Sequence, residues 1–131
     1  MKNTFVCPHC KGVLNPNVKI LLVAAANRRK GMILLSPQPG NYKYICDSSL
    51  QDAFKEGKTI TFSCPICTAD LTAEGNPKFT RMELHVAGHK KRKVEFSRIF
   101  GAQATFIIDG NEVTAFGEDA EEFDSTNFFG N

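Results

Sequence analysis

The sequence has no apolar run long enough to cross a bilayer, and no apolar segment typical of a signal peptide precedes Cys7. It also contains no glycine-rich phosphate loop, no nucleophile elbow and no His–Glu metal motif. These absences argue against a membrane protein, a secreted protein and the enzyme classes that such motifs mark. We therefore expect a cytoplasmic protein without catalytic activity. Its 131 residues suffice for one domain with a buried core.

Basic residues are missing from the C-terminal part of the chain. All sixteen Lys and Arg lie at or before Arg98, together with seven of the fourteen acidic residues. The other seven acids follow, so the end of the chain is strongly acidic. We predict one β-rich domain over residues 1–117 and an acidic, aromatic-containing tail over residues 118–131. The tail either docks onto a basic face through its phenylalanines or serves only to keep the chain soluble.

The five cysteines are unevenly placed. Cys7-Pro8-His9-Cys10 is echoed by Cys64-Pro65-Ile66-Cys67. Aligned without gaps, residues 4–14 and 61–71 share Thr, Phe, Cys, Pro, Cys and Leu at the same places. Two residues between cysteines allow both sulfurs of one turn to face the same ion. Two such turns supply four thiolates, the closed tetrahedral set of a structural zinc site.

The candidate metal ligands are therefore Cys7, Cys10, Cys64 and Cys67. Iron in a rubredoxin-like site is an alternative to zinc. A dithiol redox role is a further alternative, but a thioredoxin-like motif normally lies near a βαβ pattern, which neither motif has here. The fifth cysteine, Cys46, is predicted to be a buried and inert thiol.

The paired knuckles resemble the zinc-ribbon, or rubredoxin-like, class of four-cysteine zinc-binding folds. The resemblance covers about residues 4–14 and 59–72. It implies one structural Zn²⁺ per chain, held by the four cysteines of the two motifs. In a compact zinc ribbon the knuckles lie closer together in sequence than here, because residues 18–58 form a large insert. Zinc ribbons occur in transcription and translation factors and in enzyme appendages, so the class leaves the function open.

Hydrophobic patterns predict the elements outside the knuckles. Apolar residues over 18–35 predict a β-hairpin. Residues 47–57 are predicted to form a short helix, with Asp47 or Ser48 as the capping residue and Gly57 at the end. Alternating patterns between residues 81 and 116 predict an antiparallel β-meander. The expected fold is α+β and mainly β: a zinc ribbon with a hairpin and helix insert and a C-terminal meander.

Two basic turns are candidate sites for phosphate or a partner. They consist of Arg28, Arg29 and Lys30, and of Lys90, Lys91, Arg92 and Lys93. Clustered Lys and Arg release counterions from a nucleic-acid backbone, but such clusters are also typical of solvated turns. The acidic C-terminal part would repel phosphate or cover the basic surface. We therefore expect only weak binding of nucleic acid, and no membrane binding.

The leading hypothesis is a non-enzymatic zinc-binding module that has a structural role and contacts a protein partner or a second copy of itself. A nucleic-acid-binding or regulatory zinc-ribbon protein is the alternative. A thiol redox protein comes third.

Overall fold

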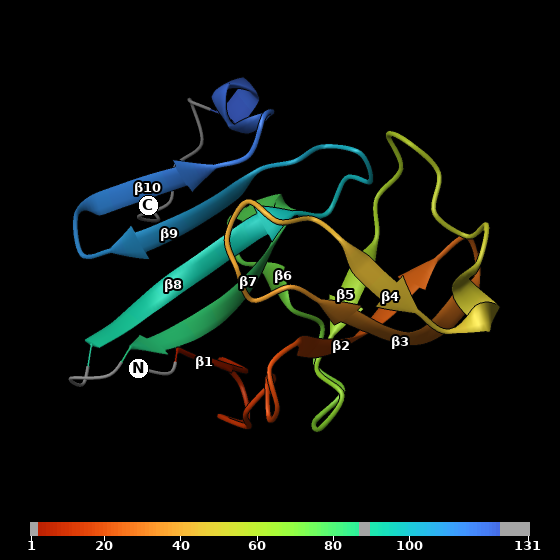
Figure 1. Cartoon of the computed structure of the whole chain (residues 1–131), viewed down its shortest axis with the longest axis horizontal. Helices are drawn as coiled ribbons and strands as arrows, with labels where there is room; N and C mark the ends of the chain where they lie inside the picture. Colours follow the sequence, from red (N-terminus) through yellow and green to blue (C-terminus); the bar gives the residue numbers. More distant parts are fainter. Residues whose placement is uncertain (1–2, 87–89, 124–131) are drawn as a thin grey trace.

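The backbone forms two antiparallel sheets in a computed structural model that describes residues 3–86 and 90–123 (Figure 1). In the six-stranded sheet the order is β1-β7-β8-β9-β10, and β6 also pairs with β7. Its strands are β1 (Thr4–Val6), β6 (Thr72–Ala73), β7 (Asn76–Val86), β8 (Lys90–Ser97), β9 (Thr105–Asp109) and β10 (Glu112–Phe116). In the four-stranded sheet the order is β4-β3-β2-β5. Its strands are β2 (Ile20–Ala26), β3 (Arg29–Leu35), β4 (Tyr44–Cys46) and β5 (Thr61–Ser63).

The α+β prediction is wrong, because 49% of the residues are in strands and 6% are helical. The helical residues form two short 3₁₀ turns, η1 (Ser48–Leu50) and η2 (Ala120–Phe123). The helix predicted over residues 47–57 is reduced to η1 and the turns after it.

Two local contacts explain why this helix does not form. The carboxylate of Asp47 does not cap η1 but accepts a hydrogen bond of 2.9 Å from the backbone N–H of Met32 in β3. Asp52 adopts a left-handed backbone conformation with φ of 64°, which ends any right-handed helix. A helix of this length is marginal by itself, so the adjacent sheet decides the local structure.

A tight hairpin joins β2 to β3 within the region where the sequence predicts one. Seven residue pairs connect the two strands, from Ile20↔Leu35 to Ala26↔Arg29. The two turn residues, Asn27 and Arg28, both have positive φ, at 51° and 64°. This is the backbone of a type I′ turn, whose twist matches that of the flanking strands.

One hydrophobic core lies between the two sheets. The four-stranded sheet contributes alternate residues of β2, such as Leu22 and Ala24, and Phe62 of β5. The six-stranded sheet contributes Met82 of β7 and Val94 of β8. Since strands from both sheets meet in one cluster of buried side chains, the sheets form a single packed unit.

A second, smaller core lies on the other face of the six-stranded sheet. It contains Phe79 of β7, Phe106 of β9 and Ala120 of η2. The ring of Phe123 packs edge-on against Phe79, with 5.0 Å between the centroids. Residues 118–123 of the predicted tail thus pack against the same chain. Whether residues 118–131 form a separate unit stays a prediction, and Phe128 and Phe129 lie outside the described residues.

Replacing Phe123 with alanine should expose this second core. We expect a loss of about 1–3 kcal/mol in the free energy of unfolding, since a half-buried ring and one aromatic pair are removed. Denaturant titration measures the loss, and amide hydrogen exchange should show faster exchange over residues 118–123. A matched control is Val113→Ala, because Val113 is exposed on β10. An equal effect of both substitutions would contradict docking through Phe123.

Candidate metal centre

The two cysteine turns have nearly the same backbone hydrogen bonds. In the first knuckle, residues 4–14, the N–H of Lys11 donates to the carbonyl of Cys7 over 3.0 Å. In the second knuckle, residues 61–71, the N–H of Thr68 donates to the carbonyl of Cys64 over the same distance. Lys11 and Thr68 also share a left-handed conformation, with φ of 65° and 66°. The sequence repeat is therefore a structural repeat.

The residues flanking the cysteines hold each knuckle on its strand. The N–H of Leu14 donates to the carbonyl of Phe5 over 2.8 Å, and that of Leu71 donates to Phe62 over 2.9 Å. Both leucines are buried, with 1% or less of their surface exposed. Phe5 and Phe62 are buried as well, so burial of these side chains explains why Phe and Leu recur in both copies of the motif.

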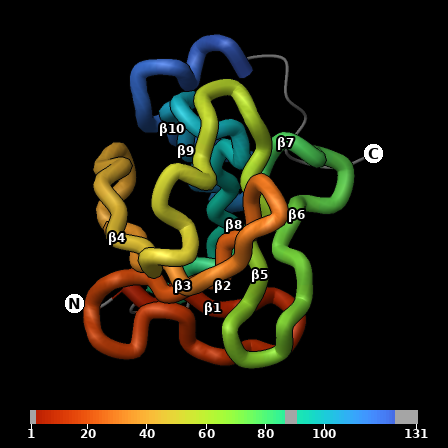
Figure 2. Tube along the Cα trace, turned by 90° about the vertical axis from the view of Figure 1, so that its right-hand side faces the viewer, coloured from red at the N-terminus to blue at the C-terminus, as the bar shows by residue number. Residues whose placement is uncertain are grey.

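The two knuckles come from different sheets and meet at one edge of the molecule. The first follows β1 of the six-stranded sheet, and the second follows β5 of the four-stranded sheet. Figures 1 and 2 show the two loops side by side at the lower edge. A bound metal would consequently tie one sheet to the other. This differs from the resemblance to a zinc ribbon, which places both knuckles on one small ribbon.

The structure brings together the four cysteines predicted as metal ligands. Their sulfurs all lie within 4.8 Å of one another. Cys7 Sγ and Cys67 Sγ are 3.8 Å apart, as are Cys10 Sγ and Cys64 Sγ. A tetrahedral ion with Zn–S bonds of about 2.3 Å requires sulfurs about 3.8 Å apart. The spacing fits such an ion, and the five cysteines of the chain are free rather than joined in disulfides.

Backbone N–H groups point at the sulfurs in both knuckles. Cys7 Sγ accepts from the N–H of His9 at 3.3 Å and of Cys10 at 3.5 Å. Cys64 Sγ accepts from the N–H of Ile66 at 3.3 Å and of Cys67 at 3.5 Å. Such donors favour thiolate over thiol, because a hydrogen bond to the charged form stabilises it.

The surroundings of the two buried cysteines, Cys7 and Cys64, shift their pKa values in opposite directions. Burial raises the pKa of the Cys7 thiol to about 12. Burial acts in the same direction on Cys64, but hydrogen bonds from the backbone N–H groups of Cys67 and Ile66 bring its pKa below the usual value. The metal-free cluster therefore cannot hold four negative charges at neutral pH. A divalent cation supplies the compensation that four thiolates need.

Gly12 lies where the second knuckle approaches the first, so a larger residue there would force the side chain of Ile66 to move. A Cβ atom at this position would lie 2.4 Å from Cδ1 of Ile66 and 3.3 Å from Sγ of Cys10. The left-handed residue of the turn is Lys11, not the glycine. The close contact between the two knuckles, rather than the turn itself, is therefore what a larger side chain at Gly12 would disturb.

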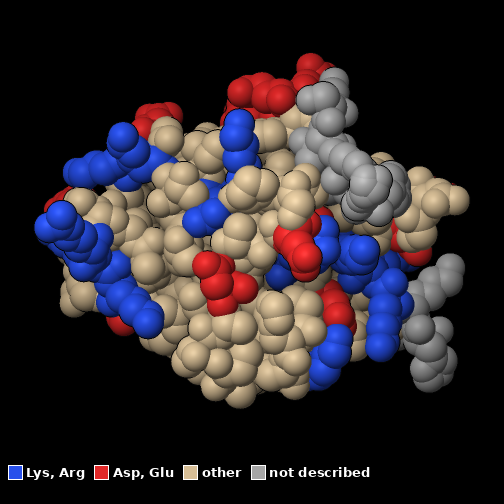
Figure 3. All heavy atoms as spheres, turned by 180° about the vertical axis from the view of Figure 1, so that it is seen from behind, with Lys and Arg blue, Asp and Glu red and all other residues tan. Residues whose placement is uncertain are grey.

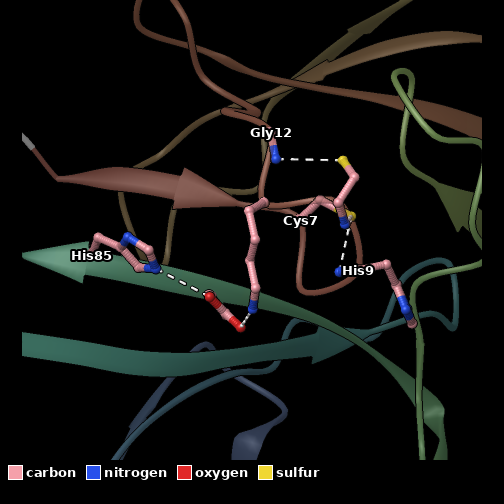
Figure 4. A network of polar contacts seen from close by, with 7 residues as sticks. Cys7, His9, Gly12 and His85 are labelled. Atoms are coloured by element: carbon pink, nitrogen blue, oxygen red, sulfur yellow. Dashed lines mark hydrogen bonds and ion pairs between the residues drawn. The ribbon is translucent and has the colours of Figure 1, made fainter.

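A short ion-pair network connects the first knuckle to β7 (Figure 4). Lys11 Nζ lies 2.7 Å from Glu83 Oε2, and His85 Nε2 lies 3.1 Å from Glu83 Oε1. Burial of Glu83 raises its pKa, but the Lys11 and His85 partners lower it more. The ring of His9 points away from the sulfurs (Figure 4). Sequence analysis missed this network, because Lys11 and Glu83 are 72 positions apart.

The fifth cysteine does not join the cluster. Cys46 ends β4 and is partly buried against the main core. It is not among the four cysteines whose sulfurs lie close together. Among the residues that the structure describes, Cys46 therefore has no partners with which it could bind a metal ion.

The two basic turns lie at opposite ends of the longest axis. Figure 1 places the β2–β3 turn at one end and the β7–β8 end of the six-stranded sheet at the other. Figure 3 shows most Lys and Arg in two separate groups at opposite edges. Some of these side chains already have partners: Arg29 donates to the carbonyl of Gln51 at 2.6 Å, and Arg92 lies 3.1 Å from Asp109. The side chain of Lys90 and all of His89 lie outside the described residues.

Comparisons with protein-family models, with curated proteins and with solved structures find no match for this chain. Among the described residues, no helix is long and apolar enough to cross a membrane. The geometry of the cysteine cluster is therefore the main indication of function.

Proposed function

We propose that this protein is a non-catalytic zinc-binding module in which one Zn²⁺ per chain joins the two sheets. The observation that carries the proposal is the cluster of four sulfurs within 4.8 Å, with backbone N–H groups directed at them. Four thiolates fill the tetrahedral coordination shell, so no position remains for a substrate or an attacking water. The local knuckle geometry also supports the resemblance to zinc ribbons, although the strands that carry the knuckles belong to different sheets.

Metal analysis of the purified protein tests this proposal. We expect one zinc per chain by elemental analysis, and a mass under native conditions that exceeds the chain by one zinc ion. If the protein instead contains one iron ion per chain, the site is of the rubredoxin-like kind rather than a zinc site. A folded protein without metal, whose cysteine pairs cycle between thiol and disulfide, would instead support the redox alternative. Because thiolate sites of this kind persist in reducing surroundings, the proposal includes a cytoplasmic location.

A protein partner is the second part of the proposal. Val13 and Ile66, which flank the cluster, are large apolar side chains with 45% and 60% of their surface exposed. Apolar side chains at the tips of rigid turns suit contact with another protein surface better than contact with phosphate. Sedimentation velocity of the native protein and of Ile66→Ser tests the self-association form of this idea. A dimer lost in the variant would support it.

Nucleic-acid binding is expected to be weak. The basic turns at Arg28–Lys30 and Lys90–Lys93 lie at opposite ends of the molecule, so one short duplex would meet only one of them. Fluorescence anisotropy with generic DNA and RNA near physiological salt should give dissociation constants in the non-specific range, about 10⁻⁴–10⁻⁶ M. Replacing Lys91 and Lys93 with glutamine should change this little. Submicromolar binding that these substitutions abolish would promote the nucleic-acid alternative.

A further inference from the structure

A cavity of about 290 Å³ opens between the two sheets, beside the main core. It is about twice as large as the cavity of ~150 Å³ that holds benzene in an engineered protein, and its size approaches that of ordinary ligand pockets. Its two walls are formed by the inner faces of the sheets, with Val94, Phe96 and Ile107 on one side and Ile20, Ile33 and Phe62 on the other.

Apolar side chains of the cavity remain partly exposed although they point into the protein. Ile107 pairs with Val94 across β9 and β8, so both face the core. Val94 is buried, whereas Ile107 and its inward-facing neighbour Phe96 are only half-buried. Leu35 of β3 is half-buried on the facing sheet. An apolar ligand would remove this surface from water, and that burial is the main source of affinity in pockets of this kind.

An aromatic cluster forms one end of the cavity. Phe54 and Phe100 stack with 5.5 Å between their ring centroids. Tyr44 packs edge-on against both, at 5.7 and 6.3 Å. All three rings line the cavity. Because the rings hold one another in place, this wall is formed before any ligand arrives.

The mouth of the cavity is polar and carries one positive charge. Residues 36–43 cross from β3 to the six-stranded sheet (Figure 1), where the hydroxyl of Tyr42 bonds Thr105 Oγ1 at 2.8 Å and the carbonyl of Phe116 at 3.2 Å. Lys43 is the only charged side chain among the described residues that line the cavity and its mouth. Asp119 adds a negative charge near Tyr42, and its carboxylate accepts a hydrogen bond of 2.8 Å from the N–H of Gln103.

The geometry points to a binding site for an amphipathic carboxylate, such as a medium-chain fatty acid. The acyl chain lies between the sheets, and the carboxylate remains at the mouth beside Lys43. An apolar interior selects for the chain, and Lys43, the one charged side chain among the described lining residues, favours an anionic end group. This site is separate from the cysteine cluster.

The cavity nevertheless depends on the two knuckles. Phe5 and Phe62 both line it, and each stands two residues before the first cysteine of a knuckle. The metal-loaded protein is therefore the form to test. Zinc content measured on the same sample separates a failure of this inference from a failure of the proposed zinc site.

Calorimetric titration of the zinc-loaded protein with decanoate provides the test, with decyltrimethylammonium as a cationic probe of equal chain length. We expect decanoate to bind and the cation to bind at least severalfold more weakly. Lys43→Gln should weaken decanoate binding about two- to fivefold, as the loss of an exposed ion pair does, and should not weaken binding of the cation. Equal binding of both probes to the native protein would overturn the carboxylate assignment.

Filling the cavity should abolish binding. Ile107→Trp places a larger side chain between the sheets and should weaken decanoate binding at least tenfold. The matched control is Ile45→Trp, because Ile45 is 59% exposed on β4 and does not line the cavity. Amide shifts of the native protein during the titration give a measurement that does not depend on a variant folding. Shifts centred on Phe96, Ile107 and Lys43 support the site; absence of shifts at millimolar decanoate, or shifts centred elsewhere, refute it.

Discussion

Replacing Cys64 with serine is expected to unfold the protein. The cluster joins a strand of the six-stranded sheet to a strand of the four-stranded sheet, so a lost ligand affects both. Binding of a structural zinc ion contributes on the order of 10 kcal/mol to folding, which is comparable to the whole stability of a domain, about 5–15 kcal/mol. Circular dichroism and the dispersion of amide resonances measure the loss, and a strong chelator should have the same effect on the native chain.

Cys46→Ala is the matched control for this experiment. It also removes a thiol, but Cys46 lies outside the cluster and is only partly buried. We expect a loss of no more than about 1–2 kcal/mol from the small change in packing. If the Cys64→Ser variant folds as well as the Cys46→Ala variant, the cluster is not a structural metal site.

Replacing Arg81 with methionine is expected to have the next largest effect. Glu95 of β8 is completely buried, and its Oε2 accepts hydrogen bonds from Arg81 Nε at 2.9 Å and Nη2 at 2.6 Å. The amide of Asn76 also donates to Glu95 Oε1 at 3.3 Å, but it is neutral and cannot replace the charge of the guanidinium. Removing one partner of a buried ion pair costs about 3–5 kcal/mol, because the other charge stays desolvated. Urea unfolding of the variant measures this loss.

The double substitution Arg81→Met with Glu95→Leu shows whether the charge or the packing is responsible. When both charges are replaced by apolar groups of similar size, no buried charge remains, and stability is often close to that of the original pair. We expect the double variant to recover most of the loss. A double variant as unstable as Arg81→Met alone would show that the pair acts through shape rather than charge.

The cysteine cluster could be predicted because its evidence is local and repeated. Each pair of cysteines needs only a few neighbouring residues to form its turn, and Phe and Leu recur where the turn is anchored. What the local pattern could not indicate is which strands carry the turns. Thr4 pairs with His85, whereas Thr61 pairs with Ala25, and these partners lie far apart in the chain. The distribution of the knuckles over two sheets follows from such pairings.

The predicted helix failed for a related reason. Asp47 is a good capping residue by local rules, but the edge of β3 offers the N–H of Met32 as an alternative donor. β3 lies between β2 and β4 and is fixed in place by Ile33, which is buried in the main core. A weak local preference therefore gave way to a contact with a strand already held by the core. The cavity could not be predicted either, because no short-range pattern indicates where side chains leave a space.

A metal bound at the cysteine cluster would also affect how quickly the chain can fold. β1 pairs with β7 at Thr4↔His85, a contact that must otherwise close a loop of about eighty residues. Once the four cysteines share an ion, the path through the metal shortens that loop to about twenty residues. Each halving of a loop lowers its closure entropy by about 0.6 kcal/mol, so two halvings favour the contact by roughly 1.2 kcal/mol. Metal that is present during synthesis should therefore accelerate assembly of the six-stranded sheet. Without metal, pairing of β1 with β7 should be slower, because the longer loop has to close first.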